Sequence, residues 1–420
     1  MEMASTGLHP TPVDHDNSFG DFGCQTAVAL EEAAAALDLE PWIVDRLRHP
    51  EEESTSYLQL IGDSGDAACV PLFHVKHGAA HCAAIGSFSL LPDLQLRACQ
   101  MMAMERTWQS ALLGLPFGGA SYGLVCDPDE LSERELARLL VLAAQRLPGR
   151  RGRRSVIFPG RGCRREFMAR AGAELSANCA VTLTGNLECV GGIDVNQFIA
   201  EGVAAVVLAG LRNQRKTPAE AKFALQGFGP LGQAISARLV SEGLTVVAVS
   251  DATGVAYRSD GLILGDIRAQ VAREGVLFGY AEADRITHAE MLRTEADVLV
   301  LASGPNEIHG NNWNAVAASL VVEAEWNAVT ATAKERLAAK GASVMPWLVA
   351  TSGALPGAYF ESRDEQIGGD IAKLLARTKD WVQQVFQRVS DSAAANDRSL
   401  DFAARQLAVE RVAECLRLCR

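Results

Sequence analysis

Apolar residues recur along the first half of the chain with two different periods, which predict alternating helices and strands. Helical spacing runs through CQTAVALEEAAAALDL, through residues 96–112, and through LSERELARLLVLAAQRL. The last segment carries Ser132 and Glu135 at the spacing of a capping box, which is typical of a helix start. Between the first two, ACVPLFHVKHGAAHCAAIGSFSL has the mixed apolar pattern of strands. We therefore expect α/β structure in this half.

The second half of the chain has a more regular pattern. After the helix-like NQFIAEGVAAVVLAGL, the apolar runs FALQGF, LTVVAVSD and ADVLVLAS are separated by helical segments. This order predicts a parallel sheet with crossover helices. The end of the chain, including DIAKLLARTKDWVQQVFQRV and AARQLAVERVAECLRLCR, again has helical spacing.

Chain length favours two domains that share one cleft, because 420 residues exceed a typical single domain. We expect residues 1–22, rich in Pro, Asp, Ser and Gly, to be disordered. Residues 23–204 then form the first domain, residues 205–350 a doubly wound Rossmann-type domain, and residues 351–420 a helical tail that returns to the first domain. The expected fold class is thus two-domain α/β.

Composition excludes some classes of function. A formal charge of -12 argues against general nucleic-acid binding. The chain has no apolar run typical of a membrane span, and its start does not resemble a signal peptide, so we expect a cytoplasmic protein. Arginines do cluster between Arg146 and Arg165. This cluster is either a solvated loop or a site for an anionic substrate or partner.

Cysteine and histidine spacing does not predict a metal site. The ten cysteines form no C-x-x-C pair, so buried thiols are favoured over zinc ligands or disulfides. His74, His77 and His81 have a ligand-like spacing, but no acidic third ligand lies near them in the sequence. We expect no metal cofactor.

A glycine-rich turn follows the first apolar run of the second domain. Gly227, Gly229 and Gly232 form G-x-G-x-x-G between a predicted strand and a predicted helix, the arrangement that binds a dinucleotide pyrophosphate. Asp251 ends the next strand, where a carboxylate can accept hydrogen bonds from ribose hydroxyls and repel a 2′-phosphate. We therefore expect NAD rather than NADP. Pro230 removes one backbone donor from the turn, and glycines that serve only packing are the alternative.

Several segments, in order, resemble the glutamate/leucine/phenylalanine/valine dehydrogenase family. They are RTWQSALLGLPFGGASYGL, DPDELSERELARL, ALQGFGPLGQAISARLVSEGLTVVAVSDATGVAYRSDGL, ADVLVLASGPNEI and SGALPGAYFE, within residues 70–420. The resemblance implies a homo-oligomer whose first domain binds a small-molecule substrate and contacts other subunits. It also implies an NAD site formed by Gly227, Phe228, Gly229, Pro230, Leu231, Gly232, Asp251, Ser303 and Asn306.

The same resemblance shows departures where the family binds and oxidises its amino acid. The family uses a lysine and an aspartate in two turns, which here read GGASYG and PGRGC, so Ser121 and Gly160 stand at those positions. Further family substrate or nicotinamide positions are held here by Gln109, Ile85, Ser89, Thr351 and Ala358. Oxidative deamination needs a proton acceptor and a group that polarises the developing imine. Ser121 carries no charge, and Gly160 cannot relay a proton.

Two hypotheses follow, and the sequence does not separate them. The chain is either an NAD-linked oxidoreductase with a rebuilt site for a non-standard substrate, or a non-catalytic homologue that acts as a regulatory or partner subunit. In the first case Ser121, Tyr122, Arg161 and Cys163 are the candidate groups, with Tyr122 as an acid and Arg161 holding a carboxylate or phosphate. In the second, Tyr122 and Cys163 serve packing and Arg161 belongs to a solvated loop.

Overall fold

The computed structural model describes residues 20–78, 83–147, 155–163, 181–183, 194–362 and 371–418. The chain divides into two compact units. Unit 1 comprises residues 1–195, 358–371 and 405–420, and unit 2 comprises residues 196–357 and 372–404. The helical tail predicted for residues 351–420 is thus divided between the units, with residues 358–371 and 405–420 in unit 1. Most of the segment expected to be disordered, residues 1–19, lies outside the described residues.

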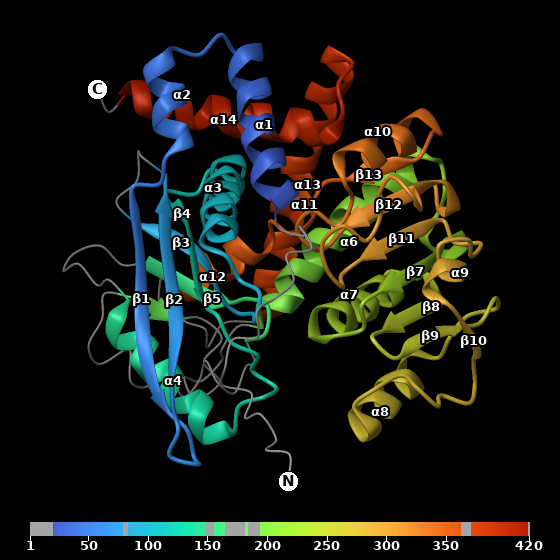
Figure 1. Ribbon diagram of the computed structural model, residues 1–420. Coiled ribbons are helices and arrows are strands. Elements are labelled where there is room, and N and C mark those ends of the chain that lie inside the picture. The colour runs from blue at the N-terminus through green and yellow to red at the C-terminus, as the bar shows by residue number, and fades with distance from the viewer. Residues whose placement is uncertain are drawn as a thin grey trace. The chain divides into compact units, whose positions relative to one another are not determined.

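Unit 1 is built on a six-stranded mixed sheet (Figure 1) in the order β1-β2-β4-β3-β5-β6. The strands β1, β2 and β4 pair antiparallel, and β4, β3, β5 and β6 pair parallel. Their bounds are β1 Glu52–Ile61, β2 Ala67–His77, β3 Ala84–Leu90, β4 Gly118–Leu124, β5 Ser155–Pro159 and β6 Val181–Leu183.

Helices pack on both faces of this sheet. Helix α3 (Leu96–Leu113) packs on β4 and β2, and α4 (Glu133–Arg146) covers the opposite face. The capping box predicted at Ser132 and Glu135 is confirmed, because each residue's side chain accepts the other's backbone N–H. The remaining helices of this unit are α1 Gly20–Ala36, α2 Pro41–Arg48, most of α12 Ala354–Ser362 and most of α14 Leu400–Leu418.

Unit 2 contains a seven-stranded sheet in the order β10-β9-β8-β7-β11-β12-β13. The apolar runs FALQGF, LTVVAVSD and ADVLVLAS form its parallel strands β7, β8 and β11, as predicted. Two antiparallel strands, β9 and β10, extend one edge and were not predicted. The bounds are β7 Lys222–Gln226, β8 Thr245–Asp251, β9 Gly254–Tyr257, β10 Asp284–Ile286, β11 Val298–Leu301, β12 Leu320–Glu323 and β13 Ser343–Met345.

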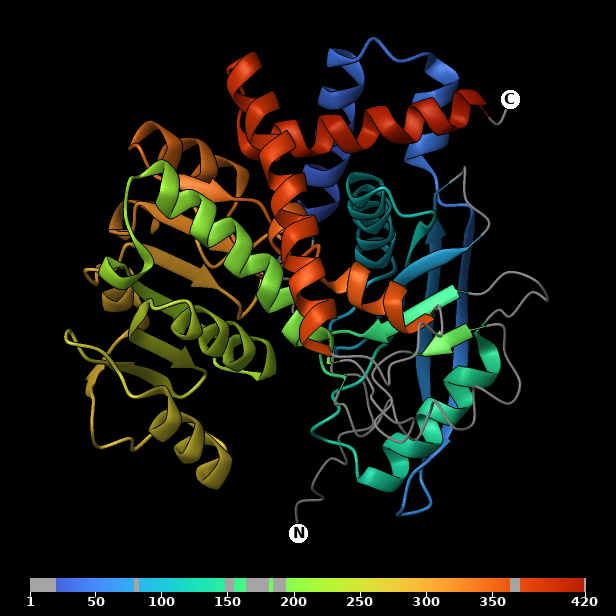
Figure 2. The same cartoon turned by 180° about the vertical axis from the view of Figure 1, so that it is seen from behind.

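The sheet of unit 2 is covered on both faces, as a doubly wound fold requires. Helices α6 (Val195–Asn213) and α7 (Pro230–Ser241) lie on the face turned toward the viewer in Figure 2. Residues of α9 (His288–Met291) and α10 (Ala331–Ala339) pack in an apolar core with residues of β7, β8, β11 and β12. The other elements are α8 Leu264–Glu274, α11 Trp347–Ala350, α13 Ile371–Asn396 and the 3-10 helices η1 Pro218–Glu220 and η2 Trp313–Ala315.

Helix α6 explains why the boundary between the units falls at Val195 and not near residue 204. It is apolar and long enough to cross a membrane, but 72% of its apolar window is buried inside the structure. At Gly210, a Cβ would lie 2.7 Å from the side chain of Leu320 on β12. This close packing identifies α6 as a core helix of unit 2.

Candidate functional site

The glycine turn of unit 2 connects β7 to α7, and its three glycines have different surroundings. Gly227 has φ +96°, and a Cβ there would lie 2.6 Å from the Ala302 backbone. A Cβ on Gly232 would lie 1.9 Å from the Gly227 carbonyl oxygen. Gly229 differs, because nothing lies within 4 Å of a Cβ built there. Two glycines therefore permit close packing, and the third leaves open space beside the backbone.

The open space lies at the N-terminus of α7. Gly229 is the N-cap residue, and no side chain caps the helix. Pro230 has no N–H, so the amides of Leu231 and Gly232 are the first donors of the helix. Helix N-termini with free amide groups attract phosphates through these donors and the helix dipole. Phe228 is buried, and its carbonyl accepts the Gln233 side chain at 3.3 Å.

Asp251 ends β8 and already accepts three hydrogen bonds. Its Oδ1 accepts the Thr253 amide at 2.7 Å and the Thr253 hydroxyl at 2.6 Å, and its Oδ2 accepts the Leu277 amide at 2.6 Å. A carboxylate offers about four acceptor positions, so Oδ2 retains room for one further donor. The carboxylate thus fits a ribose hydroxyl and also orders the loop that begins at Leu277.

A pocket adjoins the same turn. It is shallow and is lined by residues that include Thr253, Phe278, Tyr280 and Arg285. The Arg285 guanidinium lies 4.3 Å from the centroid of the Phe278 ring, which is 56% exposed. An exposed aromatic ring and a cation beside Asp251 are suited to the adenosine end of a dinucleotide.

The loop after β11 supplies the other predicted cofactor residues. Asn306 has φ +55°, and its side-chain oxygen is buried without a hydrogen-bond partner in the part of the chain that the structure describes. Such an acceptor fits a donor group from a ligand. The Ser303 hydroxyl donates to Glu307 at 2.6 Å, and Gln226 at the end of β7 donates to the same carboxylate. Glu307 was not predicted, since nothing in the sequence pairs it with Gln226.

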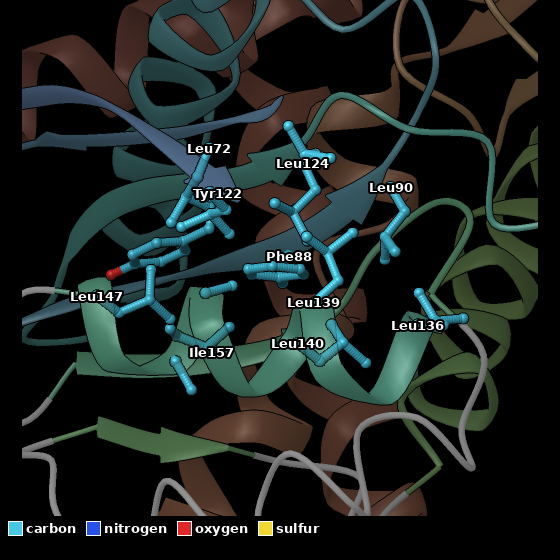
Figure 3. Close-up of a cluster of buried hydrophobic side chains, with 14 of the residues drawn as sticks. Leu72, Phe88, Leu90, Tyr122, Leu124, Leu136, Leu139, Leu140, Leu147 and Ile157 are labelled. Carbon is cyan, nitrogen blue, oxygen red and sulfur yellow. The ribbon is translucent and has the colours of Figure 1, made fainter. Parts of the chain in front are cut away.

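In unit 1 the pleat of β4 separates Ser121 from Tyr122. Tyr122 lies in the apolar core between the sheet and α4 (Figure 3), 3% exposed. Burial raises the pKa of its phenol to about 12, and its ring stacks on His74 at 5.0 Å. The predicted acid role of Tyr122 is not supported, because strand alternation turns it away from the face that carries Ser121.

Ser121 faces α3 together with polar residues of neighbouring strands. It pairs in register with Ser87 on β3, and Ser87 pairs with Phe158 on β5, so all three side chains share this face. Ser121 is 6% exposed and hydrogen-bonded to the Cys99 thiol of α3. Burial raises the pKa of Cys99 to about 12, so the thiol stays neutral near pH 7.

Two buried polar residues of α3 lie above this face. Gln109, which the sequence resemblance aligns with a family lysine, is completely buried, and its side-chain oxygen accepts Nη1 of Arg106 at 2.5 Å. Arg106 is 7% exposed, and its guanidinium carbon lies 5.1 Å from the centroid of the Phe158 ring. Arg106 was not predicted from the sequence. The signal was an arginine within the apolar stretch MMAMERTW.

The segment after β5 places the remaining candidates of unit 1. A Cβ on Gly160 would lie 2.4 Å from the Ser89 hydroxyl, so no larger side chain fits without rearrangement. The Arg161 side chain is exposed, whereas its carbonyl accepts the Leu90 amide at 2.8 Å. Cys163 packs against the apolar core, where burial raises its pKa to about 12. Most of the Arg146–Arg165 cluster lies outside the described residues.

Thr351 and the histidines complete the predicted set. The Thr351 hydroxyl is buried in unit 2 and donates to the Trp347 carbonyl at 3.0 Å. His77 bonds to Thr107 and to the Leu47 carbonyl, both at 2.8 Å, while His74 stacks on Tyr122. The two histidines therefore lie on opposite faces of β2, and His81 lies outside the described residues.

Two family models match most of the chain. The model for Glutamate/Leucine/Phenylalanine/Valine dehydrogenase matches residues 191–418, and the model for the dimerisation domain of Glu/Leu/Phe/Val dehydrogenase matches residues 50–156. The chain belongs to this dehydrogenase family. The segment 157–190, which includes Gly160, lies between the two matched regions.

Named relatives and solved structures agree with this assignment. Glutamate dehydrogenase of Thermotoga maritima is 30% identical over 395 residues, covering 91% of this chain and 94% of the relative. NAD-specific glutamate dehydrogenase A of Halobacterium salinarum is 28% identical over 394 residues, covering 92% and 90%. The structure of hetero-hexameric glutamate dehydrogenase from Thermus thermophilus, in a Leu-bound form, has a TM-score of 0.88 and 26% identity, covering 98% and 99%.

The family has a cofactor site and a substrate site, so the predicted positions for each can be compared in the two units. In unit 2 the turn, the helix N-terminus and Asp251 fit a dinucleotide. In unit 1 the positions that the family resemblance assigned to substrate chemistry hold Ser121 and Gln109 together with the buried cation Arg106. The described geometry of unit 2 therefore fits a dinucleotide, and the α3 face of unit 1 carries neutral polar side chains and one buried arginine.

Proposed function

We propose that this protein binds NAD(H) and a small metabolite without oxidising amino acids, and serves as a regulatory or partner subunit of a dehydrogenase of its own family. The observation that carries the proposal is the environment of Ser121. Its hydroxyl is hydrogen-bonded to the Cys99 thiol, which stays neutral near pH 7 because burial raises its pKa to about 12.

The chemistry of amino-acid oxidation supports the first part of the proposal. Removing a hydride from the α-carbon leaves an imine, whose formation and hydrolysis require proton transfer and charge stabilisation. At the two family positions this chain has a neutral hydroxyl, Ser121, and a residue without a side chain, Gly160. Loss of a proton-transfer group removes about 10²–10⁴-fold of rate. Amino-acid oxidation should therefore be negligible.

The cofactor part of the proposal rests on unit 2. Open space at Gly229, the uncapped start of α7 and the remaining acceptor of Asp251 all fit a dinucleotide. A carboxylate at Asp251 opposes the 2′-phosphate of NADP by like charge, so we propose NAD(H). One relative carries the same preference in its name, NAD-specific glutamate dehydrogenase A. When bound, the nicotinamide would supply a hydride acceptor or donor.

The partner part of the proposal rests on the assembly of a relative. The Thermus thermophilus structure is described as hetero-hexameric, so that dehydrogenase combines unlike subunits. Residues 50–156 here match a dimerisation domain. A chain that retains subunit contacts and changes its substrate site is suited to such a mixed assembly. We also propose a cytoplasmic location.

The decisive experiment measures binding and turnover on the same purified protein. Calorimetric titration with NADH and NADPH should give tighter binding of NADH. With NAD and glutamate, leucine, phenylalanine or valine, no NADH should form. Tighter binding of NADPH would contradict the cofactor assignment, and robust NADH formation would contradict the proposed absence of turnover.

The second candidate function is an oxidoreductase with a rebuilt substrate site. The retained dinucleotide features of unit 2 favour it. It predicts that NADH is consumed with some 2-oxo acid or other carbonyl compound in the presence of ammonium, although no standard amino acid is oxidised. Steady consumption of NADH in such a panel would establish this function in place of the first.

A further inference from the structure

We infer that the Glu307 carboxylate determines which oxidation state of the cofactor unit 2 prefers, and that it favours NAD⁺ over NADH. The inference rests on the proposed function, because it takes unit 2 as the NAD(H)-binding unit, and it names the signal to which a regulatory subunit would respond. The observation behind it is a carboxylate held by neutral groups at the carboxyl ends of β7 and β11.

Glu307 lies near the point where the strand order of the unit 2 sheet reverses. Strand β7 pairs with β8 on one side and with β11 on the other. In a doubly wound sheet, a dinucleotide spans the crevice at the carboxyl ends of the strands at such a reversal. The carboxylate of Asp251, at the end of β8, fits the adenosine ribose. The nicotinamide half therefore belongs on the β11 side, and Glu307 follows β11 there.

Two neutral side chains hold the Glu307 carboxylate in place. Gln226, the last residue of β7, donates its amide N–H to Oε2, and the Ser303 hydroxyl donates to Oε1 at 2.6 Å. Each oxygen is thus fixed from the end of a different strand. No lysine or arginine pairs with this carboxylate among the residues that the structure describes. Since amides and hydroxyls carry no net charge, the negative charge of Glu307 is left to attract a cationic group of a ligand.

The neighbouring Asn306 offers a contact that does not depend on charge. Its side-chain oxygen is buried and has no hydrogen-bond partner in the described ranges. A buried acceptor of this kind suits an N–H or O–H donor of a ligand. The ribose hydroxyls and the carboxamide of nicotinamide supply such donors in both oxidation states. Asn306 therefore fits the nicotinamide half in either form, and Glu307 is the group that distinguishes the two forms.

NAD⁺ and NADH differ in the charge of the nicotinamide ring. The oxidised ring carries a positive charge and the reduced ring is neutral, whereas the adenosine, the pyrophosphate and the riboses are the same. Glu307 is half-buried, so its charge is screened less than that of an exposed carboxylate. Attraction between a carboxylate and a cation in such a site is worth about a factor of ten in affinity. NAD⁺ should gain this factor, and NADH should not.

Calorimetric titration of the full chain with NAD⁺, NADH and ADP-ribose tests the preference. The wild type should bind NAD⁺ at least as tightly as NADH, and tighter binding of NADH would overturn the inference. ADP-ribose lacks the nicotinamide ring and reports the rest of the site. The comparison of NAD⁺ with NADH needs no variant, so it tests the inference even where a substitution at position 307 prevents folding.

Glu307→Gln tests the residue itself, because glutamine keeps the size of the side chain and an oxygen that accepts Gln226. NAD⁺ should bind this variant about 10-fold more weakly, whereas NADH and ADP-ribose should bind as before. Glu295→Gln is the matched control, since Glu295 is exposed and precedes β11, at the opposite edge of the sheet. The control should bind all three ligands as the wild type does. An unchanged ratio of NAD⁺ to NADH affinity in Glu307→Gln, or an equal loss of all three ligands, would overturn the inference.

The same samples separate this inference from the proposed function. Oxidation of an amino acid would overturn the proposed function and leave the NAD⁺ preference standing. A preference for NADH would overturn this inference and leave the absence of turnover standing. If neither NAD⁺ nor NADH binds, both are overturned.

Discussion

The positions of single side chains limit which reactions unit 1 can support. Ser121 and Tyr122 are neighbours in the sequence, yet one faces α3 beside a neutral thiol and the other fills the apolar core against α4. Gly160 is confined by the Ser89 hydroxyl and the Phe88 carbonyl. Both the space and the charge available at these positions are therefore restricted.

Restoring the two family residues should not restore activity. The double substitution Ser121→Lys with Gly160→Asp places a Cβ 2.4 Å from the Ser89 hydroxyl, and overpacking of this kind costs about 1–3 kcal/mol. Misplacement of the new groups lowers any rate further, by roughly 10²-fold. The measurement is NADH formation with glutamate, leucine, phenylalanine and valine. The single variant Ser121→Lys is the control, because it adds the positive charge without the crowding at position 160. Robust turnover by the double variant would refute the prediction.

The buried His77 should make unit 1 less stable in acid. Desolvation lowers the pKa of His77 to about 4 from an ordinary 6.5, so the unfolded state binds more protons between these two pH values. Stability from the neutral imidazole is complete above pH 6.5 and is lost progressively as the pH falls to 4, by up to about 3 kcal/mol. Thermal unfolding from pH 7 to 4 measures the effect.

Two substitutions isolate the contribution of His77. His77→Gln should reduce the pH dependence of the melting temperature between pH 6.5 and 4. His49→Gln, at an exposed histidine, should leave that dependence as it is in the wild type. Identical slopes in all three proteins would show that His77 does not titrate as its burial implies.

At the scale of elements, two features can be tested: the turn that joins β7 to α7 and the ion pairs that hold α14. The β7–α7 turn needs glycine at two positions for packing and leaves the third beside open space. In unit 1, α14 is tied to α3 by Arg405 and Glu105, and to the start of α2 by Arg417 and Glu40. Each arrangement offers a matched pair of substitutions.

The glycines of the turn should separate folding from cofactor binding. Gly229→Ala keeps an ordinary φ of -70° and meets no atom within 4 Å, so the melting temperature should stay close to that of the wild type. The added methyl group occupies the approach to the helix N-terminus and should weaken NADH binding. Gly232→Ala clashes with the Gly227 carbonyl and should destabilise unit 2. Unchanged NADH affinity in Gly229→Ala would place the pyrophosphate elsewhere.

The two ion pairs of α14 should differ in strength. Glu105 has no exposed surface and accepts the Thr26 hydroxyl at 3.0 Å in addition to Arg405. Removing its charge by Glu105→Gln leaves the Arg405 guanidinium without its carboxylate and should cost about 3 kcal/mol. Glu40→Gln breaks an exposed pair and should cost under about 1 kcal/mol. Equal losses in chemical denaturation would contradict this ranking.

At the scale of the whole molecule, the family assignment predicts an assembly. A dimerisation-domain model matches residues 50–156, and a relative with a TM-score of 0.88 is described as hetero-hexameric. Static light scattering at micromolar concentration should give a multiple of the 44.8 kDa chain mass. A monomeric mass would contradict the prediction that the chain forms a homo-oligomer. Assembly would then require a second subunit of the family.

The amino-acid sequence by itself determined the α/β class, the parallel strands β7, β8 and β11, the glycine turn between β7 and α7, and the capped start of α4. These features are local, because the period of apolar residues, the conformational freedom of glycine and the spacing of a capping box act over a few neighbouring residues. The family resemblance extended the prediction to whole segments, including the positions of Ser121 and Gln109.

Only the tertiary structure decided which side chains meet. The pleat of β4 placed Ser121 and Tyr122 on opposite faces, and the packing of α3 over the sheet brought Arg106 to Phe158, 52 residues later in the chain. The Glu307 carboxylate accepts a hydrogen bond from Gln226, and the Asp251 carboxylate accepts hydrogen bonds from the amides of Thr253 and Leu277. Contacts such as these depend on register and helix packing between distant segments, which the periodicity of a single segment does not encode.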